Sequence, residues 1–279
     1  MLTPVALTIA GSDNSAGAGI QADLKTFTHF RVYGQTVVTC VVAEVPGKVS
    51  RIQPVDLEVI RDQLFLSLEY FPVSAIKTGM LFSPEIVDLV CDAIQSQPKA
   101  RRPALVVDPV MAAGSGDPLL QSGARERYED RLFPLASVVT PNLGEAELLL
   151  GKRIPAVEAL QAAAAELARR HGVPFLVKGG HLPGGSAVDW LVAGDHAIRI
   201  SAPYTNVPTH GTGCTFSAAL AANLALGKDL EEAARAAKSY VTRAISTSLQ
   251  WVGNRGEISA LNPWARETVR RYGGKTVKQ

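Results

Sequence analysis

The sequence predicts an α/β protein, a three-layer α/β/α sandwich around a mostly parallel, doubly wound sheet with an antiparallel edge. First, short runs rich in β-branched residues alternate with longer helical patterns along the whole chain. Second, the segment "ALVVDPV" (104–110) is apolar on both faces, which is typical of a central parallel strand. Third, residues 188–203 have the pattern of a hairpin turning at Gly194 and Asp195, which predicts the antiparallel edge.

The first part of the chain contains two strand–helix units and a third strand. A strand is expected at 5–11, with a helix at 20–30 after it. A second strand at 35–44 leads to a helix at 55–71, in which apolar residues recur at helical spacing. The segment "SAIKTGM" (74–80) is expected to form the third strand. Such alternation favours parallel strands joined by covering helices.

The second part of the chain continues the alternation. The triplet Ser83-Pro84-Glu85 starts a helix, because it offers an N-cap hydroxyl, a proline at the first position and a carboxylate near the dipole. Residues 137–142 and 175–180 are apolar strands that end in polar or glycine residues. Two helices follow the hairpin, and "DLEE" (229–232) has the capping-box spacing that opens the second.

Composition and charge limit the classes of function. The net charge of +2 is too small to predict a nucleic-acid surface. Apolar stretches are shorter than the ~20 residues of a membrane helix, and the early first strand leaves no room for a signal peptide. Three dispersed cysteines without CxxC spacing predict no disulfide framework or zinc site and a reducing, cytoplasmic location. We expect a single domain over 1–262 and a basic, flexible tail over 263–279.

Unusual residues gather where the predicted parallel strands end, which is the edge at which such sheets bind ligands. They are Gly11-Ser12-Asp13, Lys77-Thr78-Gly79, Asp108-Pro109, Thr140-Pro141-Asn142 and Lys178-Gly179-Gly180. The glycines of "AGSDNSAGAGIQAD" (10–23) permit close approach of a ligand, but no GxGxxG can be aligned, and a plain turn is the alternative. On local grounds Asp23 is a solvated surface charge.

The segment "THGTGCTFSAAL" (209–220) lacks the GxxxxGK[ST] pattern of a P-loop. Its residues Gly211, Thr212, Gly213 and Cys214 nevertheless present backbone N–H groups at the positive end of a helix, an anion hole suited to a phosphoryl group. The same field would lower the thiol pKa of Cys214 and favour thiolate. A tight glycine turn with a buried, inert cysteine is the alternative.

Three further polar groups suit a nucleotide site. Asn142 and Glu145 stand three residues apart at a helix start, so they can hold Mg²⁺ through waters or form a capping box. Asp108 ends a buried strand, where a carboxylate is more often a ligand than a core residue. Lys178, followed by two glycines, suits nucleotide phosphates, with a simple turn as the alternative.

Taken together and in order, these residues resemble one family over about residues 5 to 250. The matching segments are "LTIAGSDNSAGAGIQADLKTF", "KTGM", "VVDPVM", "SGDPLL", "TPNLGEAELL", "VKGGH" and "THGTGCTFSAALAA". The sequence resembles the hydroxymethylpyrimidine/phosphomethylpyrimidine kinases of thiamin biosynthesis, in the ribokinase superfamily. The resemblance implies a ribokinase-like fold, ATP as phosphoryl donor, Mg²⁺ as cofactor and a homodimer.

The resemblance also implies roles for individual residues. Gly211, Thr212, Gly213 and Cys214 would form the catalytic anion hole, with Cys214 facing the acceptor. Asn142 and Glu145 match the NxxE magnesium motif of the superfamily. The residues expected at the ATP site are Asp108, Thr140, Lys178 and Gly180. The residues expected at the acceptor are Gly11, Ala18, Asp23, Glu44, Met80 and Val110.

One departure concerns the acceptor. Relatives usually read "AQNT" where this chain has "VVAEVPGKV" (41–49), so Glu44 replaces a glutamine expected to grip the pyrimidine edge. An amide both donates and accepts, whereas an ionised carboxylate only accepts. The expected acceptors are 4-amino-5-hydroxymethyl-2-methylpyrimidine and its monophosphate. The alternatives are pyridoxal or a related ring, a cysteine hydrolase using Cys214 with His210, and a non-catalytic pyrimidine-binding module.

Overall fold

The computed structural model describes residues 3–112, 119–180, 186–205, 207, 210–254, 256–265, 271–272 and 275–276. Nine strands form one sheet in the order β3-β2-β1-β4-β5-β6-β7-β8-β9. Their bounds are β1 Val5–Asp13, β2 Tyr33–Val45, β3 Lys48–Pro54, β4 Val73–Thr78, β5 Ala104–Val107, β6 Val138–Val139, β7 Phe175–Lys178, β8 Ser186–Ala193 and β9 His196–Pro203. The strands from β2 to β7 in this order run parallel.

Both edges of the sheet are antiparallel. The hairpin of β8 and β9 turns at Gly194 and Asp195 as predicted. The opposite edge, where β3 pairs with β2 around a turn at Pro46 and Gly47, was not predicted. The sequence of β3, "KVSRIQP", has few apolar residues and mostly exposed side chains, so it lacks the alternation that marks a half-buried strand.

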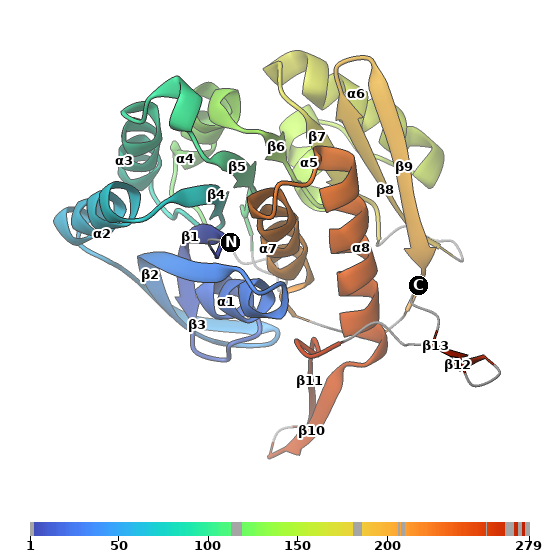
Figure 1. The fold of residues 1–279 in the computed structure, drawn as a ribbon. Coiled ribbons are helices and arrows are strands. Elements are labelled where there is room, and N and C mark those ends of the chain that lie inside the picture. The colour runs from blue at the N-terminus through green and yellow to red at the C-terminus, as the bar shows by residue number, and fades with distance from the viewer. Residues whose placement is uncertain are drawn as a thin grey trace.

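Helices cover both faces of the sheet, which confirms the three-layer α/β/α prediction (Figure 1). The helices are α1 Gly19–His29, α2 Leu57–Tyr70, α3 Pro84–Gln95, α4 Ala124–Arg127, α5 Leu143–Leu150, α6 Leu160–His171, α7 Thr212–Ala225 and α8 Leu230–Ser246. Short helical turns lie at Lys99–Arg101, Tyr128–Leu132, Phe133–Leu135 and Val157–Ala159. One core packs α1, α7 and α8 against one face, and the other core packs α2, α3, α5 and α6 against the opposite face.

The N-caps predicted for α3 and α8 are confirmed. The Ser83 hydroxyl accepts from the Ile86 amide at the start of α3, and Asp229 accepts from the Glu232 amide at the start of α8. Each interaction satisfies one of the N–H groups that the first turn of a helix leaves without an intrahelical partner. Strands β1 and β2 extend beyond the predicted ranges, whereas β4, β5, β6 and β7 end earlier than predicted, so residues 108–110 follow β5 instead of extending it.

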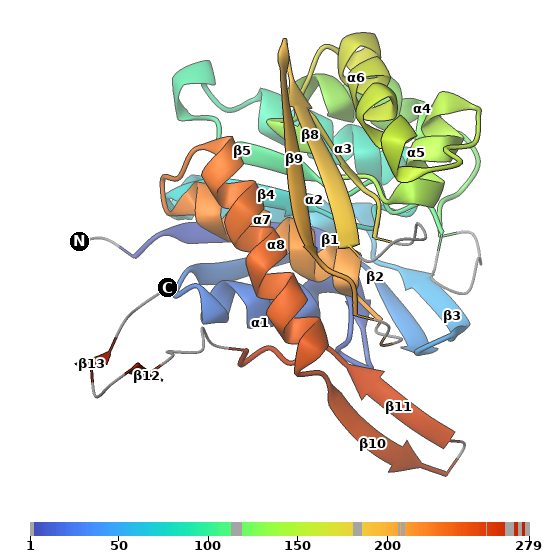
Figure 2. The same cartoon turned by 90° about the vertical axis from the view of Figure 1, so that its right-hand side faces the viewer.

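Two small hairpins lie beyond the sheet. Strands β10 (Leu249–Gly253) and β11 (Gly256–Ala260) project from the end of α8 (Figure 2). Strands β12 (Arg271–Tyr272) and β13 (Lys275–Thr276) pair within the predicted tail, most of which lies outside the described residues. Neither hairpin was predicted. Among the helices that the structure describes, none combines the length and apolarity needed to span a bilayer.

The topology creates a crevice beside β1. The connection after β1 forms α1 on one face, whereas the connection after its neighbour β4 forms α3 on the other face. Strand order therefore reverses at β1, and the loops that leave the carboxyl ends diverge there. Ligands of doubly wound sheets bind in such a crevice.

Candidate active site

A cavity of about 520 Å³ lies along the carboxyl ends of the parallel strands. Of the site residues predicted from the sequence, all except Asp23 and Thr140 line it. The cavity therefore brings together side chains from the ends of six parallel strands and from the start of α7. The strand-end motifs form one site, as their topology predicts.

The start of α7 forms the floor of this cavity. Gly211 has a φ of +82° and is the N-cap of the helix. A Cβ on Gly211 would overlap the carbonyl oxygen of Gly17, so only glycine fits this turn. A Cβ on Gly213 would lie 3.3 Å from Nζ of Lys178 and 3.7 Å from Oδ2 of Asp108. The first amides of α7 therefore open beside a lysine and an aspartate.

Cys214 is partly exposed at the same helix start, and the Gly19 amide donates to its sulfur. The prediction that the helix field would favour thiolate is wrong. Burial of the sulfur raises the pKa of Cys214 to about 11, although the Lys77 ammonium lowers it. The thiol is therefore protonated at neutral pH, and any role it has begins from the S–H form.

Asp23 lies beneath the cavity, which corrects two expectations. Its side chain is fully buried, so it is not a solvated surface charge, and it does not line the cavity. Its Oδ2 accepts from Oγ1 of Thr8 at 2.6 Å and from Nζ of Lys77 at 2.8 Å. Burial alone would lower the pKa of Lys77, but the Asp23 charge outweighs it and keeps Lys77 protonated. Asp23 thus anchors a cavity-lining cation.

A second buried pair lies deeper along the sheet edge. Nζ of Lys178 is 3.0 Å from Oδ1 of Asp108, whose Oδ2 accepts from the Ser217 hydroxyl at 3.1 Å. Thr140 is fully buried behind this pair, and its hydroxyl donates to the Val107 carbonyl at 3.3 Å. Thr140 was expected at the ATP site, but its side chain does not line the cavity.

Asn142 and Glu145 form the capping box of α5 and also line the cavity. Oδ1 of Asn142 accepts from the Glu145 amide at 2.9 Å, and Oε2 of Glu145 accepts from the Asn142 amide at 2.8 Å. Burial, followed by the negative charge of Asp108, raises the pKa of Glu145 to about 8. Two carboxyl groups in one buried region attract a cation.

The opposite end of the cavity is apolar. Cys40, Val42, Met80 and Leu119 form a buried cluster, against which Val110 packs. A Cβ on Gly11 would come within 2.8 Å of the Cys40 sulfur, so glycine lets β1 lie close to this cluster. These walls suit the faces of a small ring.

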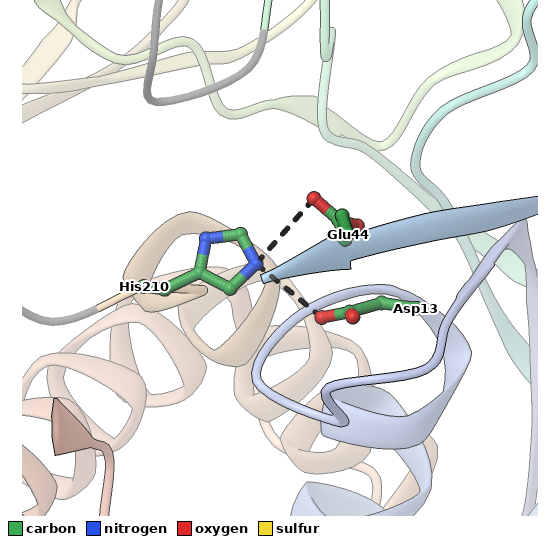
Figure 3. Close-up of side chains that lie close together, drawn as sticks. All are labelled: Asp13, Glu44 and His210. Carbon is green, nitrogen blue, oxygen red and sulfur yellow. Dashed lines mark hydrogen bonds and ion pairs between the residues drawn. The ribbon is translucent and has the colours of Figure 1, made fainter. Parts of the chain in front are cut away.

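A polar trio beside these apolar walls was only partly foreseen (Figure 3). Nε2 of His210 lies 3.3 Å from Oδ2 of Asp13 and 3.9 Å from Oε2 of Glu44. Since this nitrogen faces two carboxylates, the alternative of a cysteine hydrolase that pairs His210 with Cys214 gains no support. Asp13 was noticed only as part of a strand-end triplet, and its place at the end of β1 was the signal.

Two further ion pairs contain cavity residues that the sequence analysis did not single out. Lys77 was seen only within a motif, and the pair of Lys238 Nζ with Asp189 Oδ2 at 2.7 Å was not predicted at all. Both members of that pair line the cavity. Residues 115–118 of "SGDPLL", together with His181 and Thr209 of the other motifs, lie outside the described residues.

Comparison with known proteins gives one family. The family model "Phosphomethylpyrimidine kinase" matches residues 13–259. The hydroxymethylpyrimidine/phosphomethylpyrimidine kinase of Rhizobium meliloti is 42% identical over 270 residues, covering 95% of this chain and all of the relative. The pyridoxine kinase of Bacillus subtilis is 40% identical, covering 89% and 93% of the two chains. The pyridoxal kinase of Staphylococcus aureus, solved with AMP-PCP and pyridoxal, has a TM-score of 0.84 at 34% identity and 95% coverage of both chains. The chain therefore belongs to the phosphomethylpyrimidine kinase family.

Proposed function

We propose that this protein transfers the γ-phosphoryl group of ATP to the hydroxymethyl group of 4-amino-5-hydroxymethyl-2-methylpyrimidine, and then phosphorylates the monophosphate. One observation carries the proposal. A single cavity joins apolar walls of ring size to a glycine-rich helix start flanked by Lys178 and Asp108. Ring and phosphate chemistry thus meet in one enclosure, with Cys214 at the junction.

The phosphate end suits ATP through its cations. Lys77, Lys178 and Lys238 line the cavity, and each is held by a buried carboxylate. Fixed positive charges beside the first amides of α7 would stabilise the charge that spreads over a transferring phosphoryl group. The AMP-PCP complex of the Staphylococcus aureus relative is in line with this assignment.

The residues of the predicted magnesium motif fit Mg²⁺. Asn142 and Glu145 offer oxygen ligands, and burial with the nearby Asp108 charge raises the pKa of Glu145 even though the Lys178 ammonium lowers it, so this acid pair would be stabilised by a further cation. We propose that Glu145 and Asn142, with Asp108 nearby, hold the ion with its waters. Bound Mg²⁺ would neutralise charge on the ATP phosphates.

The chain's own residues supply positioning more than acid–base chemistry. The acceptor ring packs between the walls formed by Val42, Met80 and Val110, with its hydroxymethyl group toward Cys214. Because the Cys214 thiol is protonated, it enters the reaction as a hydrogen-bond donor or contact surface and not as a ready base. Holding the hydroxyl in line with the γ-phosphoryl group is the main contribution, as phosphoryl transfer requires.

Pyridoxal is the second candidate acceptor, because it also carries a hydroxymethyl group on a six-membered nitrogen ring. The similarity to the Bacillus subtilis pyridoxine kinase and the Staphylococcus aureus pyridoxal kinase favours testing it. The test measures ADP release with ATP and Mg²⁺ for each acceptor. We expect a higher kcat/KM with the aminopyrimidine. A higher value with pyridoxal would replace the proposal, and binding without ADP release would indicate a non-catalytic module.

We also propose a cytoplasmic homodimer. Apolar side chains of α2 and the neighbouring strand β2 are exposed, which favours a further protein surface against them. They are Tyr33, Val41, Val59, Phe65, Leu66 and Tyr70. All three cysteines are free thiols, as a reducing compartment requires. Light scattering at micromolar concentration tests the dimer, and a monomer mass would contradict it.

A further inference from the structure

The side chains of Asp13, Glu44 and His210 converge beside the apolar walls of the cavity, although they come from three separate segments of the chain (Figure 3). One ligand atom from each side chain lies within 4.8 Å of the other two. We propose that this trio binds a divalent transition-metal ion such as Zn²⁺, and that the bound ion excludes the acceptor. The metal site is independent of the proposed function, whereas the exclusion of the acceptor rests on it.

The chemistry and spacing of the three side chains suit such an ion. An imidazole nitrogen and two carboxylate oxygens are ligands that Zn²⁺ accepts. In a tetrahedral site with bonds of about 2.0–2.2 Å, the donor atoms lie about 3.3–3.6 Å apart. Nε2 of His210 lies 3.3 Å from Oδ2 of Asp13 and 3.9 Å from Oε2 of Glu44. The set therefore closes around an ion after a small movement of Glu44, and it needs no cysteine.

Asp13 has the support that a metal-binding carboxylate requires. Its side chain is almost fully buried, and its Oδ1 accepts from the Ser15 amide at 2.7 Å. Its Oδ2 accepts from the Ser15 hydroxyl at 2.9 Å and from the Ala18 amide at 2.8 Å. Hydrogen bonds of this kind behind a ligating carboxylate fix its orientation and strengthen metal binding. An ion would therefore meet an oxygen that is already in place.

His210 directs one ring nitrogen at the place between the two carboxylates (Figure 3). A Cβ on Gly17 would come within 2.9 Å of Cδ2 of the ring, so the imidazole lies directly against the Gly17 backbone. Metal binding to Nε2 replaces the proton that this nitrogen shares with Oδ2 of Asp13, and that proton is released to solvent. The ring needs no reorientation for this exchange.

Glu44 completes the set with a carboxylate that is held in place but not used. Its backbone amide donates to Oδ1 of Asn14 at 2.7 Å, which ties the end of β2 to the loop after β1. Among the described residues, no group donates a hydrogen bond to its carboxylate, although that side chain is only 12% exposed. Two carboxylates facing one imidazole favour a further positive charge between them. The glutamine usual at this position would offer only a neutral amide oxygen.

The position of the site explains why the ion would exclude the acceptor. All three ligands line the cavity, beside the apolar cluster that contains Val42 and Met80. Three protein ligands leave one tetrahedral position of Zn²⁺ open to water. The ion and its water would fill space beside the proposed ring position and occupy the Glu44 carboxylate. We therefore expect the metal ion and the aminopyrimidine to bind in competition.

A Co²⁺ titration tests the site in the absence of ATP and acceptor. Co²⁺ takes the same ligands as Zn²⁺ and gives visible absorption that reports its coordination. In excess Mg²⁺, which occupies the site proposed at Asn142 and Glu145, we expect a single Co²⁺ ion to bind each chain and Zn²⁺ to displace it. Glu44→Gln and His210→Gln should each weaken Co²⁺ binding at least about 10-fold, because each removes a ligand.

Matched variants control for changes that do not concern the site. Glu158→Gln and His196→Gln make the same substitutions at exposed positions outside the cavity, and both should keep the wild-type affinity for Co²⁺. Strong near-ultraviolet absorption from a cobalt–thiolate bond would identify Cys214 as a ligand and contradict the proposed set. Thermal unfolding without metal checks that each variant keeps the fold.

Steady-state kinetics test the exclusion of the acceptor. With free Zn²⁺ fixed by a metal buffer and with saturating ATP and Mg²⁺, we expect KM for 4-amino-5-hydroxymethyl-2-methylpyrimidine to rise with Zn²⁺ while kcat stays constant. The Zn²⁺ concentration that doubles KM should be at least about 10-fold higher for Glu44→Gln than for wild type.

The outcomes separate the metal site from the proposed function. If wild type binds no Co²⁺, or if Glu44→Gln and His210→Gln bind it as tightly as wild type, the site is overturned. If the ion binds but Zn²⁺ leaves KM unchanged, the exclusion of the acceptor is overturned. If wild type does not phosphorylate the aminopyrimidine, the proposed function fails, and the Co²⁺ titration still decides the metal site.

Discussion

The buried pair of Lys77 and Asp23 provides the sharpest test of how the site is supported. Nζ of Lys77 and Oδ2 of Asp23 are 2.8 Å apart, and both side chains are fully buried. Lys77→Met keeps much of the volume of the lysine but removes its charge. Asp23 then keeps the Thr8 hydroxyl as donor on Oδ2, while its Oδ1 has no hydrogen-bond partner among the described residues.

The expected loss follows from this burial. Breaking a buried pair by removing one partner costs about 3–5 kcal/mol of the free energy of unfolding, because the remaining charge is uncompensated. Asp23→Asn should cost a similar amount by leaving the Lys77 ammonium unpaired. The double variant removes both charges, so it should lose at least about 2 kcal/mol less than the sum of the single losses.

Urea unfolding, followed by circular dichroism and tryptophan fluorescence, measures these losses where the two probes coincide. The matched control is Lys152→Met, since Nζ of Lys152 is 2.6 Å from Oε2 of Glu166 but its side chain is 59% exposed. We expect that control to cost less than about 1 kcal/mol. If Lys77→Met costs no more than Lys152→Met, or if the single losses simply add, our reasoning about the buried pair is refuted.

Three further predictions concern the cavity. Cys214→Ala should lower kcat about 100-fold with an unchanged unfolding midpoint, and unchanged turnover would remove the thiol from the mechanism. The pKa of Asp13 falls from 3.8 to about 2 on folding, so its ionisation contributes about 2 kcal/mol to the free energy of unfolding above pH 4. This contribution is lost as pH falls toward 2. Urea unfolding from pH 5 to 2.5 should therefore show a shallower decline in the free energy of unfolding for Asp13→Asn than for wild type. Gly211→Ala should destabilise the protein by several kcal/mol, because the new Cβ would overlap the Gly17 carbonyl. The control Gly172→Ala, at a φ of +70° with no atom within 4 Å, should cost about 1 kcal/mol. Equal losses of stability in the two variants would contradict the close contact at Gly211.

The sequence predicts the site well where the fold makes distant residues converge. Each strand-end motif is weak alone, but parallel strands align their carboxyl ends, so Asp108, Asn142 and Lys178 must lie along one edge. The glycine turn before α7 was also predictable from the sequence, because the first amides of a helix have no intrahelical partner and remain open to a ligand. The family resemblance supplied the expected roles of these residues, and the structure supplied the apolar lining of the cavity beside them.

The sequence-based predictions that were wrong or incomplete share one cause, because burial and pairing between distant residues are not visible in local sequence patterns. Asp23 has its cationic partner 54 positions further along the chain, so local patterns describe it as a surface charge. Burial raises the pKa of Cys214 more than the Lys77 ammonium lowers it, and burial cannot be read from a glycine-rich turn. Strands β3, β10 and β11 carry many exposed side chains, so hydrophobic alternation does not mark them.

Each of the three lysines that line the cavity is paired with a carboxylate, which explains how the fold accommodates three buried positive charges without a ligand. Lys77, Lys178 and Lys238 each face a carboxylate on a neighbouring element, at 2.8, 3.0 and 2.7 Å respectively. An unpaired buried ammonium would lose its proton or destabilise the fold, whereas a paired one keeps its charge and its position. The three ammonium groups are therefore charged and positioned in the free protein, and we expect their side chains to move little when a triphosphate binds. Because preorganised charge is what stabilises a transferring phosphoryl group, we expect the carboxylates that hold these lysines, Asp23 beneath the cavity and Asp189 on its wall, to affect turnover through the lysines.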